Sequence, residues 1–153
     1  MKKFRFRLET LLKFRQMQED QAQVRLAEAT ESWQQEQAQL AGLHDNLAAN
    51  LALFSQQQST GSLPVETLKI FSDYTDKINR MISDQQIQVA KAASRRQECL
   101  SVLERAIQQR QLVSNLREKC LDRYKEELLQ DEQKILDELG TQAFGRNRGR
   151  GIQ

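Results

Sequence analysis

The sequence predicts an all-α protein: a long antiparallel two-helix coiled-coil hairpin with unequal arms and a flexible basic tail. Three observations predict this fold. The 153 residues include six glycines and one proline, too few turn-forming residues for a sandwich or a barrel. Apolar residues recur at steps of three and four along two long stretches, as in a heptad repeat. One break, residues 55–64, separates the two stretches and holds the only proline.

We expect one coiled-coil domain over residues 1–153, in four parts: a first arm over about 4–55, a turn over 56–64, a second arm over about 65–139, and a disordered tail over 140–153. The turn follows from backbone chemistry. Pro64 has no N–H to donate and disfavours the helical conformation at Leu63. It can open the second helix, whose first turn then carries Glu66 near the positive end of the helix dipole.

The first arm has an apolar stripe with a period near 3.5, which implies a left-handed supercoil. Arg15 and Gln18 interrupt the stripe near its N-terminal end. Trp33 lies on the stripe, so it is a packed core aromatic or, alternatively, a partner-binding residue. The stripe consists of Phe4, Leu8, Leu11, Ala22, Leu26, Ala29, Trp33, Leu40, Leu43, Leu47, Leu51 and Phe54.

The second arm continues the same pattern over a longer stretch, and Arg96, Arg110 and Arg117 fall on stripe positions and loosen it. Gly140 is expected to stop the helix, and the tail beyond it has too little apolar content to order itself. The stripe consists of Leu68, Phe71, Tyr74, Ile78, Ile82, Val89, Ala93, Leu100, Leu103, Ile107, Leu121, Tyr124, Leu128, Ile135 and Leu139.

Folding the arms together pairs Phe54 with about position 67 and Leu8 with about position 113. The register is fixed only to within a heptad. Residues 117–139 then have no partner in the chain, although they keep an apolar stripe. A helix with an unburied stripe is marginal alone, so this overhang predicts a binding partner.

Charge is placed unevenly along the chain. The net charge of +2 combines +5 over residues 1–15, −6 over 16–140 and +3 in the tail. Nucleic-acid binding is disfavoured because the long middle is acidic. Contact of residues 1–15 with a membrane surface is an alternative, since Phe4, Phe6, Leu8, Leu11 and Leu12 lie among basic groups. With no apolar run of about 18 residues and no signal-peptide pattern, we expect a cytosolic protein.

No pattern in the sequence points to catalysis. It has no phosphate-binding glycine loop, no Cys-x-x-Cys pair, and a single histidine, His44, on a polar flank. Cys99 and Cys120 lie on one predicted helix, roughly 30 Å apart, too far to form a disulfide. We therefore expect no enzyme activity, no cofactor, no metal and no small-molecule substrate.

The run Phe4-Arg5-Phe6-Arg7-Leu8-Glu9-Thr10-Leu11-Leu12, followed by Arg15, Glu19 and Ala22, resembles the opening of the FliJ family. The members of this family are soluble components of the bacterial flagellar type III export apparatus. The resemblance extends over the whole chain, through its length, the two unequal heptad arms, the break near residue 60 and the basic tail.

The resemblance implies a monomeric stalk like the central-shaft subunit of rotary ATPases. Its two ends would insert into the hexameric flagellar export ATPase, promote assembly and activity of that ring, and link it to the cytoplasmic domain of the membrane export gate. Export chaperones are a further class of partner. The expected location is cytoplasmic, peripheral to the inner face of the membrane at the flagellar base. The implied ring-binding residues are Phe4, Arg5, Phe6, Arg7, Leu8, Leu11, Leu121, Tyr124, Leu128 and Ile135.

In the family, the gate-binding surface lies near the hairpin end and crosses both arms. By position, the residues here that resemble it are Gln39, Leu43, Tyr74 and Ile78. Asn46 and Asn50 fall where the family can carry aromatic residues. Tyr74 and Ile78 also lie on the second stripe, so a core position is an equal alternative for both.

Two rival functions stay open on the sequence. One is a related shaft, such as an injectisome stalk or a vacuolar-type ATPase central subunit; the Phe-x-Phe-Arg-Leu opening favours the flagellar form. The other is a cytosolic coiled-coil chaperone or scaffold that homodimerises through continuous helices. That model needs residues 55–64 to be helical, which Gly61 and Pro64 oppose.

Overall fold

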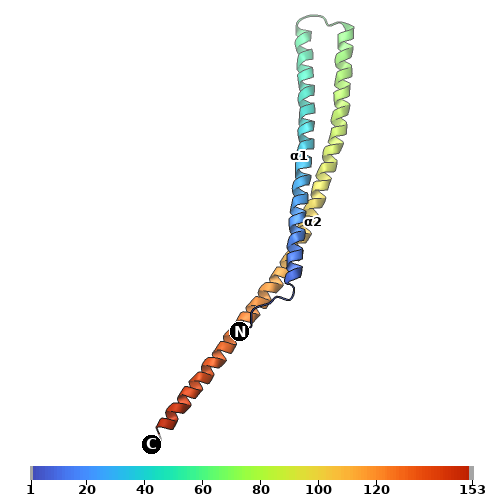
Figure 1. Ribbon diagram of the computed structural model, residues 1–153. Helices are drawn as coiled ribbons and strands as arrows, with labels where there is room; N and C mark the ends of the chain where they lie inside the picture. The colour runs from blue at the N-terminus through green and yellow to red at the C-terminus, as the bar shows by residue number, and fades with distance from the viewer. Residues whose placement is uncertain (1, 152–153) are drawn as a thin grey trace. The chain divides into compact units, whose positions relative to one another are not determined.

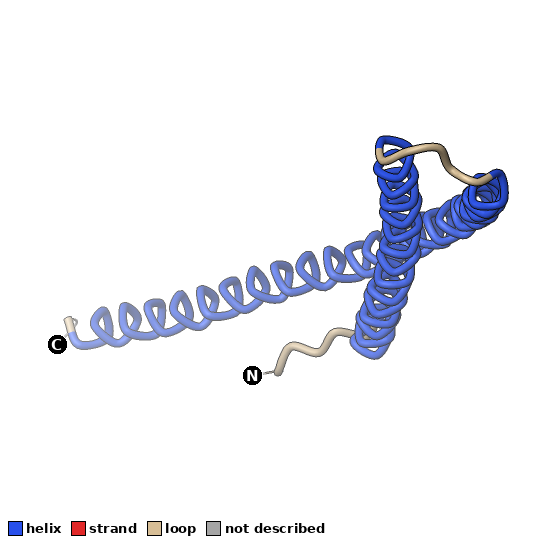
Figure 2. The backbone as a smooth tube through the Cα atoms, turned by 90° about the horizontal axis from the view of Figure 1, so that it is seen from above, coloured by secondary structure: helices blue, strands red, loops and turns tan. Residues whose placement is uncertain are grey.

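The computed structural model describes residues 2–151 and consists of two long helices, α1 (Glu9–Ser59) and α2 (Val65–Arg150). The helices pack against each other as an antiparallel hairpin (Figure 1). Over residues 2–151 there is no strand, and loop backbone lies before α1, between the helices and at the end of α2 (Figure 2). The predicted all-α hairpin with unequal arms is confirmed.

The chain divides into two compact units, each described by itself below. The hairpin unit is Gln18–Ala106. The terminal unit takes in both chain ends, up to Met17 and from Ile107 onward. Within the described residues, no helix is long and apolar enough to cross a membrane.

The connection between the helices is shorter than the predicted turn. Residues 56–59 stay helical, because the break in the backbone comes only at Thr60 and Gly61. The Thr60 hydroxyl donates to the carbonyl of Gln57, and Gly61 has a φ of +147°, a conformation that favours glycine. Beyond it, the Pro64 carbonyl accepts hydrogen bonds from the amides of Thr67 and Leu68, so proline opens α2 as predicted.

Buried and half-buried residues recur mostly at steps of three and four, the spacing of a coiled-coil seam. In the hairpin unit the buried apolar residues are Ala22, Ala29, Ile78, Ile82, Ala92 and Ala106. Several predicted seam residues are displaced by one position, because the spacing of the seam, rather than the hydrophobicity of each residue, decides which neighbour is covered. Leu12, Asn50, Thr75, Ala92 and Ala106 are more buried than the neighbours that the sequence predicted, Leu11, Leu51, Tyr74, Ala93 and Ile107.

The register of the hairpin differs from the prediction by about four residues. In the hairpin unit Phe54 pairs with Phe71, with ring centroids 5.3 Å apart, rather than with position 67. In the terminal unit Glu9 meets Arg117, where the predicted register put Leu8 near position 113. Because α1 extends to Ser59, the middle of the connection lies later in the sequence than predicted, and the facing residues shift with it. A heptad seam has apolar positions every three or four residues, so the helices can pair in the shifted register.

The predicted end of the second helix at Gly140 is wrong, because α2 continues through that residue to Arg150. Gly140 lacks the positive φ of a helix-ending glycine. The last turn carries Arg148 and Arg150, which suit the negative end of the helix dipole. The Arg148 guanidinium also lies 5.6 Å from the centre of the Phe144 ring. The flexibility of the tail stays a prediction, and residues 152–153 lie outside the described part.

Candidate functional site

In the terminal unit, the non-helical residues 2–8 lie along the side of α2; we call this segment the N-terminal clasp. The Phe4 and Tyr124 rings pack with their centroids 5.5 Å apart and their planes tilted by 49°. The Tyr124 hydroxyl donates a hydrogen bond to the Lys2 carbonyl. The first arm was predicted to be helical from about residue 4, so this extended segment is a correction.

Arg117 is held at the point where the clasp joins α1. Its Nε lies 3.1 Å from a carboxylate oxygen of Glu9, and its guanidinium lies 5.9 Å from the centre of the Phe4 ring. Both members of the ion pair are about two-fifths exposed, so we expect the pair to contribute no more than about 1 kcal/mol. An arginine that interrupts the predicted apolar stripe is therefore accommodated by Glu9 at the start of α1 and by Phe4 of the clasp.

The clasp has two different faces. Phe4 and Phe6 are half-buried, whereas Arg5 and Arg7 between and after them are exposed. This alternation is the two-residue period of an extended chain, with one face on α2 and one in solvent. A shallow groove of about 340 Å³ runs beside it, lined by Phe4, Arg5, Phe6, Glu9 and Arg117.

The predicted overhang is therefore partly covered. The clasp lies over residues 117–124 of α2, so this part of the prediction is wrong. Leu121, Tyr124 and Leu128 are half-buried, whereas Ile135 is 57% exposed. Beyond Leu128, the exposed large apolar residues of α2 are Leu129, Ile135, Leu136, Leu139 and Phe144.

All ten predicted ring-binding residues lie in the terminal unit, which takes in both ends of the chain. Six are half-buried and four are exposed. The half-buried residues are Phe4, Phe6, Leu11, Leu121, Tyr124 and Leu128, and the exposed ones are Arg5, Arg7, Leu8 and Ile135.

In the hairpin unit, Gln39 and Leu43 line a groove of about 470 Å³, called the hairpin groove below. Gly42 and Asn46 complete its wall on α1, and α2 contributes Met81, Asp84, Gln85 and Gln88. Amide side chains dominate its rim, and Asp84 is the one lining residue that carries a formal charge. Gly42 bears no side chain, and a Cβ built there would meet no other atom within 4 Å, so the groove is open at this point.

The other two predicted gate-binding residues are placed differently. Ile78 is only 3% exposed, so its side chain belongs to the seam. Tyr74 is 45% exposed and lies seven residues before Met81, on the same edge of α2. Sequence reasoning missed Met81, although its position one residue before buried Ile82 and two turns after Tyr74 was the available signal.

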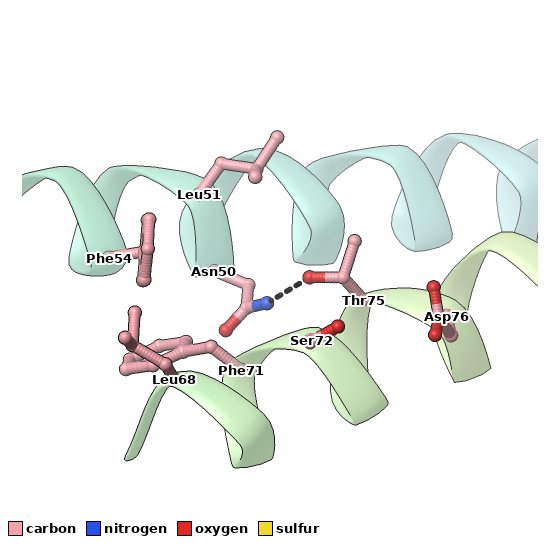
Figure 3. Close-up of a pocket in the computed structure, with 8 residues that line it drawn as sticks. All are labelled: Asn50, Leu51, Phe54, Leu68, Phe71, Ser72, Thr75 and Asp76. Carbon is pink, nitrogen blue, oxygen red and sulfur yellow. Dashed lines mark hydrogen bonds between the residues drawn. The ribbon is translucent and has the colours of Figure 1, made fainter. Parts of the chain in front are cut away.

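Beside the connection, the seam is partly polar. Asn50 is the one polar side chain that is buried among the described residues, and its amide nitrogen donates to the Thr75 hydroxyl over 3.1 Å. Phe54 lies against Leu68 and Phe71, whereas Leu51 points away from α2 (Figure 3). These residues border a second groove, of about 320 Å³, with Ser72 and Asp76 on its rim.

Further polar layers cross the seam at intervals. In the hairpin unit the Gln85 amide donates to the backbone and side chain of Glu36, and Arg96 donates to the Thr30 hydroxyl. The Arg96 guanidinium also lies 5.0 Å from the centre of the Trp33 ring, so the half-buried Trp33 side chain contacts α2. In the terminal unit Arg15 donates to Gln109 over 2.7 Å.

The chemical inventory of the described residues is limited. They contain no group of three or more His, Cys, Asp or Glu side chains arranged to hold a metal ion. Cys99 and Cys120 are free thiols, both half-buried. The surface of the described residues carries grooves, exposed apolar side chains and basic groups. Surfaces of this kind bind other macromolecules.

The fold defines the class of the protein: a coiled-coil hairpin with open grooves and exposed apolar side chains. A family model described as "Flagellar FliJ protein" matches residues 4–149, nearly the whole chain. The chain therefore belongs to the FliJ family, whose members are structural components of flagellar protein export rather than known enzymes. Neither the curated proteins nor the solved structures gave a match.

Proposed function

We propose that this chain is a non-enzymatic stalk that joins two parts of the flagellar export apparatus. The terminal unit inserts into the hexameric export ATPase and promotes its assembly and activity. The hairpin unit contacts the cytoplasmic domain of the membrane export gate, which keeps the protein at the inner face of the membrane at the flagellar base. Membership of the FliJ family supports the export role, and the separation of the two sets of surfaces into two units supports two partners.

The observation that carries the ring contact is the uncovered apolar surface of α2. Leu129, Ile135, Leu136 and Leu139 are each more than half exposed. Leu128 and Leu129, like Ile135 and Leu136, are neighbours in the chain, so each pair spans about 100° around the helix. An apolar sector of this width exceeds the seam of a two-helix coiled coil. A lumen that surrounds the helix would cover it, whereas a single partner helix would not.

Residues of the clasp and of the covered part of α2 complete the proposed ring contact: Phe4, Arg5, Phe6, Arg7, Leu8, Leu11, Leu121, Tyr124 and Leu128. At the other end, the hairpin groove is the proposed gate contact. Gln39, Leu43 and Tyr74 contribute from the predicted set and Met81 joins them, while Ile78 supports the surface from within the seam. Export chaperones remain a proposed further class of partner.

Replacing Ile135, Leu136 and Leu139 together by serine tests the ring contact. Because the three side chains are exposed, we expect the helix content by circular dichroism to stay within a tenth of wild type. Binding to the purified hexameric ATPase, measured by sedimentation, should weaken at least tenfold. A matched control replaces Leu53, Val65 and Ile70, which are also more than half exposed but lie in the hairpin unit, and should bind normally. Equal binding by both variants would refute the ring contact.

The rival scaffold model predicts a dimer of continuous helices. It requires helix through residues 55–64, whereas the structure has a non-helical connection after Ser59, with a positive φ at Gly61. A monomeric mass by light scattering at micromolar concentration is the expected result, and a stable dimer would favour the rival.

A further inference from the structure

We propose that the N-terminal clasp is a releasable cover over residues 117–124 of α2, closed in the free protein and displaced when that face binds its partner. The closed state is an intramolecular contact that competes with the partner. The identity of the partner as the ATPase ring rests on the proposed function; the existence of the cover does not.

The clasp matches the face of α2 that it covers. Arg117, Leu121 and Tyr124 follow one another at steps of four and three, so they lie along one face of α2. Phe4 packs on Tyr124 at one end of this face, and Glu9 holds Arg117 at the other. The apolar part of the face, which would otherwise be in water, thus has an occupant from the same chain.

The cover is held weakly enough to leave. The described contacts between residues 2–8 and α2 are the Phe4–Tyr124 ring pair, the Arg117 guanidinium over the Phe4 ring and the hydrogen bond from Tyr124 to the Lys2 carbonyl. The half-exposed ion pair between Arg117 and Glu9, the first residue of α1, holds the point where the clasp joins that helix. Residues 2–8 are non-helical, and at this junction the carbonyls of Phe6 and Leu8 accept backbone hydrogen bonds from the amides of Glu9 and Leu12. Short segments with few buried contacts open at low free-energy cost.

The outer face of the clasp is basic. Lys2, Lys3, Arg5 and Arg7 are all exposed on the clasp. An acidic surface that approaches them can attract the clasp while its apolar residues are still on α2. Release then exposes both Phe4 and Tyr124 to the same partner. Binding and opening are coupled in this way, so conditions that open the clasp raise the apparent affinity for the partner.

The two native thiols give a test of the closed state in the free protein. Cys120 lies on α2 between Arg117 and Tyr124, and Cys99 lies in the hairpin unit. In a Cys99→Ser background, deleting residues 2–7 should raise the rate of labelling of Cys120 by a thiol reagent at least threefold. In a Cys120→Ser background, the same deletion should leave the labelling rate of Cys99 unchanged. Equal rates for Cys120 with and without the clasp would overturn the cover.

A charge reversal tests whether opening is part of binding. Glu9→Arg repels Arg117 and weakens the clasp, and Glu66→Arg is its matched control. Both glutamates lie in the first turn of a helix, so the two substitutions cost the same against the dipole and change net charge equally. We expect Glu9→Arg to speed both Cys120 labelling and association with the purified ATPase hexamer at least twofold relative to Glu66→Arg.

The outcomes separate the two hypotheses. Faster labelling without faster association would overturn the coupling between release and binding. Faster labelling with no ATPase binding by any variant, wild type included, would leave the cover standing and refute the proposed ring function. No change in labelling would refute the cover, whatever the ATPase does.

Discussion

Asn50 shows how a single side chain can fix the pairing of the two helices. It is buried in the seam and bonds to the Thr75 hydroxyl, so any other register leaves its amide without that partner. A buried asparagine in a coiled coil lowers stability but selects one alignment. The sequence placed the more apolar neighbours Leu51 and Tyr74 on the stripe, in place of Asn50 and Thr75. Single-residue errors of this kind arise because hydrophobicity alone cannot separate two adjacent positions.

Asn50→Leu should therefore stabilise the hairpin and loosen its specificity. We expect the free energy of unfolding to rise by about 1 kcal/mol, because a seam leucine replaces a buried amide. The Thr75 hydroxyl is only half-buried, so it can bond to water or to a carbonyl of its own helix instead. A fraction of dimer should appear in size-exclusion chromatography with light scattering, as the arms accept other alignments. Asn79→Leu, an exposed substitution on α2, is the control and should stay monomeric. A variant that is less stable than wild type would contradict this role.

Gly42 is the second residue whose role shows only in the structure. It stands inside α1 with a helical backbone, and no atom lies within 4 Å of a Cβ built there, so neither the backbone nor packing requires glycine. A glycine in a helix interior costs about 1 kcal/mol relative to alanine. What the missing side chain provides is the open wall of the hairpin groove.

Gly42→Leu should raise the thermal midpoint of unfolding and yet weaken binding to the export-gate cytoplasmic domain at least fivefold, because leucine fills the groove. Gly140→Leu is the matched control, since that glycine is also helical with open space around it. It should stabilise α2 and leave gate binding unchanged. If Gly42→Leu binds the gate like wild type, as measured by calorimetry, the hairpin groove is not the contact.

At the scale of the elements, periodicity was enough to predict two helices of unequal length and the place of the connection. The exact ends were not predictable in the same way. The sequence predicts a helix end at Gly140 because glycine often adopts a positive φ at helix ends. In the structure Gly61 has a positive φ, whereas Gly140 does not. Likewise, Phe4 and Leu8 continue the heptad spacing, so nothing in the pattern showed that residues 2–8 leave the helix. The clasp arises from tertiary contacts to α2, which periodicity does not contain.

Alanine substitutions at Gly140 and Gly61 distinguish a glycine inside a helix from a glycine with a positive φ. Gly140→Ala should stabilise the protein by about 0.5–1 kcal/mol, because it improves a helix interior without a clash. Gly61→Ala should destabilise it by about 1 kcal/mol or more, since alanine is strained at a φ of +147°. Urea unfolding followed by circular dichroism measures both. A destabilised Gly140→Ala protein would mean that the helix does end at that residue, as the sequence alone predicted.

At the scale of the whole molecule, the chain carries its chemistry as surfaces, divided between two units. The basic clasp, the basic C-terminal turn of α2 and the uncovered apolar residues belong to the terminal unit, and the amide-rimmed groove belongs to the hairpin unit. Composition and stripe positions were sufficient to predict that a partner must cover the second arm. The kind of partner was inferred from the resemblance of the N-terminal run to the FliJ family. The match over residues 4–149 confirms the family. Heptad sequence alone carries too little information to identify the kind of partner.

The central claim is that the terminal unit activates the export ATPase. The most direct test measures the hydrolysis rate and the hexamer fraction of the cognate ATPase with the intact protein and with a chain that lacks residues 117–153. We expect stimulation of both quantities by the intact chain, because a lumen-filling helix stabilises the closed ring. The truncated chain should give no stimulation. If the intact protein has no effect at concentrations well above that of the ring, the terminal unit does not activate the ATPase.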